Sequence, residues 1–510
     1  MKKKILAIFM ALAMVFTSIA FTPSVSFAAK HGNKYSQKYH KDVYGQYAYS
    51  VLKYMDKNLT QRIAGTEQEV KAAEYIKREL KSFGYDVEIQ PFSYTRKGVT
   101  YNSQNVVATK KGQSSKEIIV GAHYDSVKTN GVDDNGSGTV VNLETAKRVA
   151  RKKTPYTIKF VFFGAEEVGL KGSKAYSDAM TAEEVQNTLY MVNMDSMLAG
   201  TYRYLYSGVY NSATGVVENA WPAEQAMKLA DALGTGMRFN NTELNYDYPT
   251  PSTGTWSDHA SFRNKMPYLY FEAANWELPD DPEHPEWGSS GAYETETGEV
   301  MHVPGRDDLT FIETTWGNRG RCTIAAYCKL LDNVLYQLHP DGLITPSKDE
   351  LNEAINEATN MKDTFLSKQD AKMLEAALQS ANKVNETEYV LLKDQAVIDN
   401  ATKKLEKTVK SIENKVKVTV KNNGKKQQKQ IITVKYGNRV LREGKDYTIS
   451  YVEDEDLVVT NDVESEEVEA KSFKHKHDKE EDKQKETIKV LITGMRNYQG
   501  SVEVTLKNRR

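Results

Sequence analysis

Four short apolar runs constrain the fold of this chain more than any other feature. They are rich in β-branched and aromatic residues and span 117–123, 157–163, 189–195 and 267–273. A run that is apolar at consecutive positions predicts a strand buried on both faces, as in the parallel sheet of an α/β fold. Helical patterns at 137–151 and 218–233 lie between the runs. We therefore predict a mixed, mostly parallel sheet flanked by helices, which occupies about 41–340.

Polar and acidic side chains follow several of these predicted strands directly. The run at 117–123 ends in His123 and is followed by Asp125, the next run is followed by Glu166 and Glu167, and the third ends in Asp195. In open α/β sheets, ligands bind at the carboxyl ends of the strands. The sequence therefore predicts that these side chains share one site.

The stretch GVDDNGSGTV, residues 131–140, places the carboxylates of Asp133 and Asp134 side by side. Adjacent like charges repel, and Gly136 and Gly138 allow a tight turn into the helix that follows. Two divalent cations about 3.5–4 Å apart can share one carboxylate and neutralise it. We interpret Asp134 as such a bridging group, which would make the neighbouring Asp133 tolerable.

The donors at these strand ends indicate a hydrolytic metal centre rather than a nucleophile triad. A further imidazole comes from His302 in VMHVPGRDDL. Neutral imidazole suits zinc, and we predict that Asp125 fixes the tautomer of His123 from behind. In the pair Glu166 and Glu167, one carboxylate would bind metal while the other stays free as a general base.

The order of these motifs resembles that of the co-catalytic zinc aminopeptidases of peptidase family M28. The motifs are H-x-D, D-D-N-G-S-G, A-E-E-x-G, a strand-end Asp, S-D-H and a final His, within about 60–340. The resemblance implies a zinc exopeptidase fold and a secreted metalloaminopeptidase. Such a hydrolase removes the N-terminal residue from peptides or proteins and uses two Zn²⁺ ions per chain.

The resemblance also implies a role for each matching position. Five residues would bind the metal ions, namely His123 and Asp195 on one zinc, Glu167 and His302 on the other, and Asp134 on both. Glu166 would be the general base that acts on a water held between the two ions. Asp125 would belong to the catalytic group as the carboxylate behind His123.

Two late histidines compete for the last ligand position. We choose His302, because MHVPGRDDL matches the family's His-x-x-x-x-Asp turn before the last helix. Asp258 and His259, in WSDHASF, match residues that support the ligands from behind. Many relatives place Tyr before the final His, and this chain has Met301 instead. The residue that stabilises the oxyanion is therefore not assigned.

Other functions on the same fold stay open at this stage. One is a different zinc hydrolase or transferase, such as a carboxypeptidase or a glutaminyl cyclase; another is a non-catalytic binding protein displayed on a surface. Cyclases keep a single metal and inactive relatives lose ligands, so the full ligand set favours the aminopeptidase. The sequence does not fix the preferred N-terminal side chain, the oligomeric state or the native metal, since zinc, cobalt and manganese share such ligands.

The pattern of the N-terminus is typical of a targeting segment. Three lysines precede a short apolar run, and Ser26-Phe27-Ala28 offers a small-x-small cleavage site. We predict a signal peptide over 1–28, a peptidase domain over 29–340 and an extracellular protein. No other apolar stretch approaches the roughly 20 residues of a membrane span.

Two further segments are predicted after the peptidase domain. Residues 347–413 have the pattern of a helical module that opens with a Ser347–Glu350 capping box. Residues 416–510 have the pattern of a small β-sandwich-like, Ig-like module with a charged insertion at 452–486. Their resemblance to accessory modules implies non-covalent contact with cell wall, glycan or protein. The net charge of −1 shows no excess of basic residues of the kind that indicates nucleic-acid binding.

Overall fold

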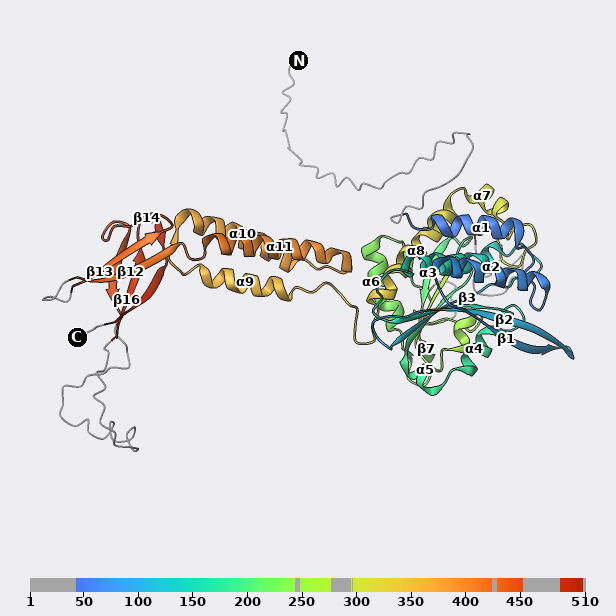
Figure 1. Ribbon diagram of the computed structural model, residues 1–510. Coiled ribbons are helices and arrows are strands. Elements are labelled where there is room, and N and C mark those ends of the chain that lie inside the picture. Colours follow the sequence, from blue (N-terminus) through green and yellow to red (C-terminus); the bar gives the residue numbers. More distant parts are fainter. Residues whose placement is uncertain are drawn as a thin grey trace, which may run out of the picture. The chain divides into compact units, whose positions relative to one another are not determined.

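The computed structural model describes residues 43–243, 248–276, 295, 297–423, 429–452 and 487–507. A mixed eight-stranded sheet forms the centre of the described residues up to 340 (Figure 1). The strand order is β1-β2-β4-β3-β5-β10-β6-β9. The strands are β1 (Val87–Arg96), β2 (Val99–Lys110), β3 (Glu117–His123), β4 (Thr157–Phe163), β5 (Thr188–Met194), β6 (Tyr202–Tyr206), β9 (Met237–Arg238) and β10 (Tyr268–Ala274). The central strands β4, β3, β5 and β10 are mutually parallel, which confirms the predicted mixed, mostly parallel sheet.

The four predicted runs are these central strands, and their register brings their carboxyl ends to one edge. Gly121 of β3 lies opposite Val161 of β4 and Asn193 of β5, and Met194 of β5 lies opposite Phe271 of β10. Residues that follow β3, β4 and β5 therefore meet in space, as expected for a parallel sheet.

Helices bury both faces of this sheet (Figure 1). One face carries α1 (Gln46–Asn58), α2 (Glu67–Phe83), α3 (Gly138–Val149), α6 (Trp221–Leu233) and α8 (Arg319–Gln337), and the other carries α4 (Lys171–Ala179) and α5 (Ala182–Asn187). Along β3, Ile118 and Val120 belong to the core of the first face, while Ile119 belongs to the core of the second. Continuous apolar runs are the consequence of this two-sided burial.

The remaining elements of this part are short. A separate ribbon pairs β7 (Val209–Asn211) with β8 (Val216–Glu218), and α7 (Leu309–Trp316) precedes α8. The two cysteines, Cys322 and Cys328, lie on α8 as free thiols, the first exposed and the second buried. No helix in the described ranges is long and apolar enough to cross a membrane.

The C-terminal part contains helices followed by two small sheets. The helices are α9 (Asp349–Met361), α10 (Lys368–Glu386) and α11 (Gln395–Ile412). The main strands are β12 (Val416–Asn423), β13 (Lys429–Tyr436), β14 (Arg439–Val440), β15 (Tyr447–Tyr451), β16 (Thr487–Gly494) and β18 (Ser501–Lys507), in two sheets ordered β12-β13-β14 and β15-β16-β18. This sequence of helices and strands matches the predicted one, whereas the module boundaries stay a prediction. The signal peptide and nearly all of the charged insertion lie outside the described residues.

The predicted capping box at the start of α9 is wrong. The helix begins at Asp349 with Lys348 as its N-cap residue, and no side chain caps it. The Ser347 hydroxyl donates instead to Asp349 Oδ2 at 2.8 Å and accepts from the Asp349 N–H at 3.2 Å. The serine thus bonds two residues ahead, so the S-x-x-E spacing does not act as a box here.

Candidate metal centre

The carboxyl edge of the sheet gathers the five predicted donors from five separate segments. His123 is the last residue of β3, Glu167 follows β4 and Asp195 follows β5. Asp134 lies in the irregular helical turn Val132–Ser137 that leads into α3, and His302 precedes α7. The register of the parallel strands therefore places the donors from β3, β4 and β5 side by side.

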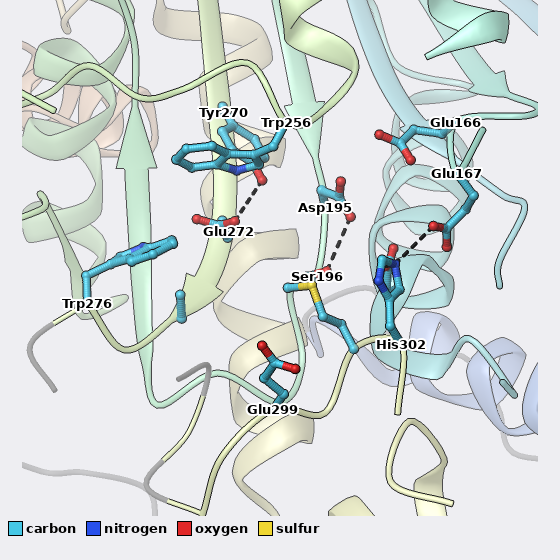
Figure 2. A pocket seen from close by; sticks show the side chains of 13 residues that line it. Glu166, Glu167, Asp195, Ser196, Trp256, Tyr270, Glu272, Trp276, Glu299 and His302 are labelled. Carbon is cyan, nitrogen blue, oxygen red and sulfur yellow. Dashed lines mark hydrogen bonds and ion pairs between the residues drawn. The ribbon is translucent and has the colours of Figure 1, made fainter. Parts of the chain in front are cut away.

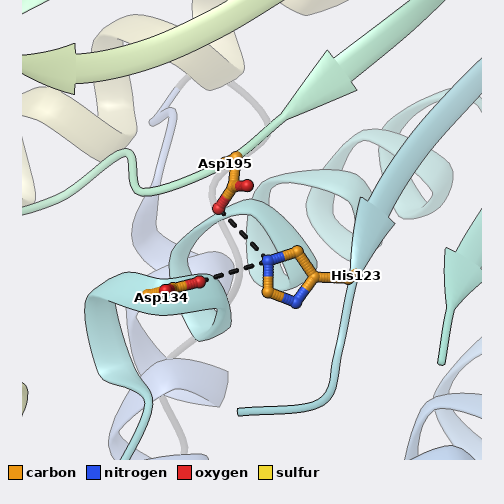
Figure 3. Close-up of side chains that lie close together, drawn as sticks. All are labelled: His123, Asp134 and Asp195. Atoms are coloured by element: carbon orange, nitrogen blue, oxygen red, sulfur yellow. Dashed lines mark hydrogen bonds and ion pairs between the residues drawn. The ribbon is translucent and has the colours of Figure 1, made fainter. Parts of the chain in front are cut away.

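The donors form two groups that share Asp134. In the first, Nε2 of His123 lies 3.1 Å from Oδ1 of Asp134 and 3.3 Å from Oδ1 of Asp195 (Figure 3). In the second, Nε2 of His302 lies 2.8 Å from Oδ2 of Asp134 and 3.0 Å from Oε2 of Glu167 (Figure 2). Within each group the donor atoms lie within 4.8 Å of one another. Each oxygen of Asp134 thus faces a different imidazole, which is the arrangement of a bridging carboxylate.

This donor set fits a pair of divalent cations. Each group offers one imidazole nitrogen and two carboxylate oxygens, the ligand types that zinc takes in catalytic sites. Hydrogen bonds that the His302 ring donates to the carboxylates of Asp134 and Glu167 raise its pKa to about 11. Burial alone would raise the pKa of Asp134, but hydrogen bonds from His123 and His302 hold it below its usual value. Since a metal ion would compete with protons for such donors, any metal affinity of this donor set would fall at low pH.

Asp125 lies next to both the backbone of Glu166 and Glu167 and the imidazole of His123. Its Oδ1 accepts the Glu166 N–H at 3.0 Å and its Oδ2 accepts the Glu167 N–H at 3.2 Å, while Nδ1 of His123 lies 3.5 Å from Oδ1. The carboxylate is fully buried. Asp125 therefore positions the backbone of the glutamate pair, a contact that the sequence analysis did not predict. Nδ1 of His123 makes no hydrogen bond in the described residues, so the predicted contact between Asp125 and the imidazole is present only as an ion-pair distance.

Glu166 and Glu167 differ in their surroundings although they are adjacent. Glu167 belongs to the second donor group, whereas Glu166 belongs to neither of the groups found among the described residues. Both line a cavity of about 330 Å³. Burial raises the pKa of Glu166 well above its usual value, opposed by the charge of His123 and reinforced by Asp258. A carboxyl beside the donors whose pKa is raised can both accept and return a proton.

Backbone amide groups hold Asp133, a contact that the sequence analysis did not predict. Its Oδ1 accepts the backbone N–H groups of Leu198 at 2.7 Å and Ala199 at 3.1 Å. Its own N–H donates to Oδ1 of Asp307 at 2.6 Å. Burial nonetheless raises the pKa of Asp133 to about 7. The segment after β5 therefore anchors Asp133 through its amide groups, separately from the donors that face Asp134.

Two buried charged residues near the site escaped the sequence analysis. Arg62 is fully buried and donates to the carbonyl oxygens of Tyr124 at 2.5 Å and Gly131 at 2.7 Å. Glu69 accepts the Ala165 N–H at 3.1 Å, directly before Glu166, and the hydroxyl of Ser103 at 2.6 Å. Burial raises the pKa of Glu69 to about 7. Their partners are distant in sequence, so local patterns carry no signal for them.

The S-D-H motif supports the site through its serine. The Ser257 hydroxyl donates to Oδ2 of Asp195 at 2.6 Å and accepts from the Asn193 side chain at 2.8 Å. Asp258 is fully buried, and burial raises its pKa to about 7. Ser257 is thus the residue of the motif that holds a proposed donor, a role that the sequence analysis did not give it.

His259 has a different environment from the one expected for a residue behind a ligand. Its Nε2 lies 2.8 Å from the carbonyl oxygen of Gly254, and its ring packs against Tyr268 and Tyr270 at centroid distances of 4.8 and 4.7 Å. Burial lowers its pKa to about 4. A neutral ring between two tyrosines supports the fold beside the cavity rather than a metal ion.

The cavity extends beyond the donors to aromatic and acidic residues. Its other lining residues are Ser196, Trp256, Tyr270, Glu272, Ala274, Trp276, Glu299 and Met301 (Figure 2). Met301 lies where the family's tyrosine was expected. Trp276 lies at the start of the segment 275–305 that leads to His302, and most of this segment lies outside the described residues.

Comparison with known proteins identifies the family of the chain. The model of peptidase family M28 matches residues 105–308. The alkaline phosphatase isozyme conversion protein of Escherichia coli K12 is 30% identical over 242 residues, which cover 42% of this chain and 69% of that protein. Aminopeptidase YwaD of Bacillus subtilis 168 is 31% identical over 208 residues, which cover 39% of this chain and 40% of its own length. The chain belongs to peptidase family M28, and with aminopeptidases among its relatives the predicted metalloaminopeptidase class is confirmed.

The solved structures that match this chain include zinc aminopeptidases and glutaminyl cyclases. The zinc aminopeptidase BSAP from Bacillus subtilis matches with a TM-score of 0.43 and 18% identity, over 57% of this chain and 95% of that one. A glutaminyl cyclase from Porphyromonas gingivalis matches with a TM-score of 0.44 and 19% identity, over 57% of this chain and 98% of the other.

Proposed function

We propose that this chain is an exported zinc aminopeptidase that uses two zinc ions to remove the N-terminal residue from peptides. The observation that carries the proposal is the position of Asp134, whose two oxygens face two separate groups of donors. A single-metal enzyme needs only one such group. The shared carboxylate therefore supports a dinuclear site and disfavours the cyclase alternative.

The proposed roles follow the geometry of the two groups. His123 and Asp195 hold one zinc, Glu167 and His302 hold the other, and Asp134 bridges them. When bound, the zinc ions would supply Lewis acidity, which polarises the scissile carbonyl and lowers the pKa of the attacking water.

Glu166 is the group that transfers the proton in this mechanism. Its carboxylate accepts a proton from the attacking water and then donates it to the amine that leaves. Burial raises its pKa, so the carboxyl holds the proton between the two steps. Asp125 fixes the backbone of Glu166 and keeps the carboxylate at the cavity.

The charge of the cavity distinguishes the two ends of a peptide. The described lining includes carboxylates such as Asp195 and Glu166 and contains neither Lys nor Arg. A free ammonium group is attracted to such a lining, whereas a C-terminal carboxylate would need a cation. The lining therefore favours an aminopeptidase over a carboxypeptidase.

A substrate panel tests the proposed function. We expect hydrolysis of aminoacyl-nitroanilides with a free amine, and none of N-blocked peptides or carboxypeptidase substrates. Chelation should remove most turnover because the donors then hold no Lewis acid, and added zinc should restore it. Turnover that survives complete zinc removal would contradict the metal-dependent mechanism. Cyclisation of N-terminal Gln without peptide hydrolysis would assign the site to a transferase.

Export and the role of the C-terminal part rest on the sequence alone. The basic and apolar start with its small-x-small site supports removal of residues 1–28. We expect N-terminal sequencing of the exported protein to begin at Ala29. Part of that protein should be retained on isolated cell wall if residues 347–510 contact wall or glycan. An intact N-terminus on the exported protein would contradict the predicted cleavage.

A further inference from the structure

One wall of the cavity combines aromatic rings with a buried carboxylate. Tyr270, Glu272 and Ala274 alternate along β10 and line this wall. Trp256 and Trp276 lie beside them, with ring centroids 5.8 Å apart. Figure 2 shows the Glu272 carboxylate near both tryptophans, on the side of the cavity away from Glu166 and His302. This wall, defined by these five residues, is named the aromatic wall.

Glu272 has one unused oxygen although it is buried. The residue is 4% exposed, and its Oε1 accepts the Tyr270 hydroxyl at 3.0 Å. Oε2 makes no hydrogen bond of normal geometry in the described residues, although Tyr206 and Trp256 lie close enough to the carboxyl to oppose the rise of its pKa. A buried carboxylate oxygen without a partner is costly, so its presence at a cavity indicates a partner that arrives with a ligand.

The charge and aromatic character of the cavity specify a cation as that partner. The described lining contains neither Lys nor Arg, and Glu299 adds a second carboxylate to the same cavity. The π electrons of a tryptophan face attract a cation, and this attraction adds to that of a carboxylate. Trp276 is held in place because its Nε1–H donates to the Tyr206 hydroxyl at 2.7 Å.

The position of the aromatic wall relates this cation to the substrate. Asp195, itself a proposed donor, and Ser196 lie between the wall and the second donor group along the cavity lining (Figure 2). Glu272 belongs to neither metal-donor group found in the described residues. A peptide with its scissile carbonyl at the donors would therefore extend its first side chain towards the wall.

We infer that the aromatic wall selects peptides with lysine or arginine as their N-terminal residue, whose cationic side chain pairs with Glu272 and stacks on the tryptophans. The inference rests on the proposed aminopeptidase function and adds the substrate class that the sequence left open. A rival role for Glu272 is to hold the α-ammonium group. That role would affect all N-terminal residues equally, whereas a side-chain role discriminates among them.

Two matched pairs of substrates measure the selectivity. Norleucine is lysine without its ammonium group, and citrulline replaces the guanidinium of arginine by a neutral group of similar shape. We expect kcat/KM of the zinc-loaded full chain for lysyl-nitroanilide to exceed that for norleucyl-nitroanilide by at least about tenfold, with arginine and citrulline alike. Because burial raises the pKa of Glu272 to about 7, the assay is run near pH 8.

The Glu272→Gln variant then locates the origin of the preference. We expect its lysine-to-norleucine ratio to fall to about one, while Glu224→Gln, an equal charge change at an exposed position of α6, keeps the wild-type ratio. An equal loss for both substrates in Glu272→Gln would overturn the inference in favour of the α-ammonium role. If that variant fails to fold, the wild-type ratios decide: equal rates for lysine and norleucine overturn the inference alone, and no hydrolysis of either overturns the proposed function.

Discussion

Replacing Glu166 by glutamine will lower kcat by about 10²–10⁴-fold and leave two zinc ions bound per chain. The amide has nearly the same shape as the carboxylate but cannot accept a proton from the attacking water. Glu166 lines the cavity and lies outside both donor groups, so its replacement removes no proposed ligand. Steady-state kinetics combined with metal analysis of the same sample provides the measurement.

The neighbouring residue supplies the control for this substitution. Glu167→Gln changes the adjacent carboxylate in the same way, yet Oε2 of Glu167 lies 3.0 Å from Nε2 of His302 in the second donor group. We expect Glu167→Gln to lose one zinc, and Glu166→Gln to keep both. Near-normal kcat in a fully loaded Glu166→Gln enzyme would remove Glu166 from the role of base. Loss of zinc from it would move Glu166 among the ligands.

The sheet could be predicted because burial on both faces leaves a signal in consecutive residues. Ile118, Ile119 and Val120 are all fully buried, although they face alternate sides of β3. The same regularity made the grouping of the proposed donors predictable. His123 and Asp195 adjoin the ends of parallel strands, and such ends share one edge of the sheet independently of the loop conformations.

Contacts that depend on loop conformation could not be predicted. Asp133 is anchored by the amides of Leu198 and Ala199, which are more than sixty positions away. Nothing near Asp133 in the sequence indicates these donors, so the local argument assigned the stabilisation to metal ions. Ser257 likewise reaches Asp195 only because the turn before β10 folds back onto the end of β5. These are tertiary contacts, which residue type and spacing do not encode locally.

The role of the aromatic wall could not be predicted from the sequence either. Glu272 stands within an apolar run, where a single glutamate looks like an exception to a buried strand. Its meaning depends on Trp256 and Trp276, which approach it from segments before and after β10. Only the assembled cavity distinguishes a specificity residue from a buried acid. The sequence therefore predicted the site of chemistry and left the preferred side chain open.

The two late histidines give the sharpest test of the metal assignment. His302→Ala should lower the zinc content from two ions to one, because its Nε2 is the only imidazole nitrogen of the second donor group. The affinity lost should exceed the roughly 10–100-fold that loss of an outer partner costs. Turnover should fall with the zinc, since the bridging arrangement at Asp134 is then incomplete. Zinc titration of the purified variant provides the measurement.

His259 is the matched control because it is also an imidazole, and its ring packs against Tyr270 of the cavity lining. Its ring packs between Tyr268 and Tyr270 and bonds to Gly254, so His259→Phe should keep two zinc ions and most of the ring packing. The lost hydrogen bond should cost about 1 kcal/mol of the free energy of unfolding. If His259→Phe is folded and lacks one zinc while His302→Ala keeps both, the ligand is His259 and the second donor group must be redrawn. If only His302→Ala loses zinc, the turn before α7 supplies the ligand, and the exposed half of that imidazole explains how metal enters the site.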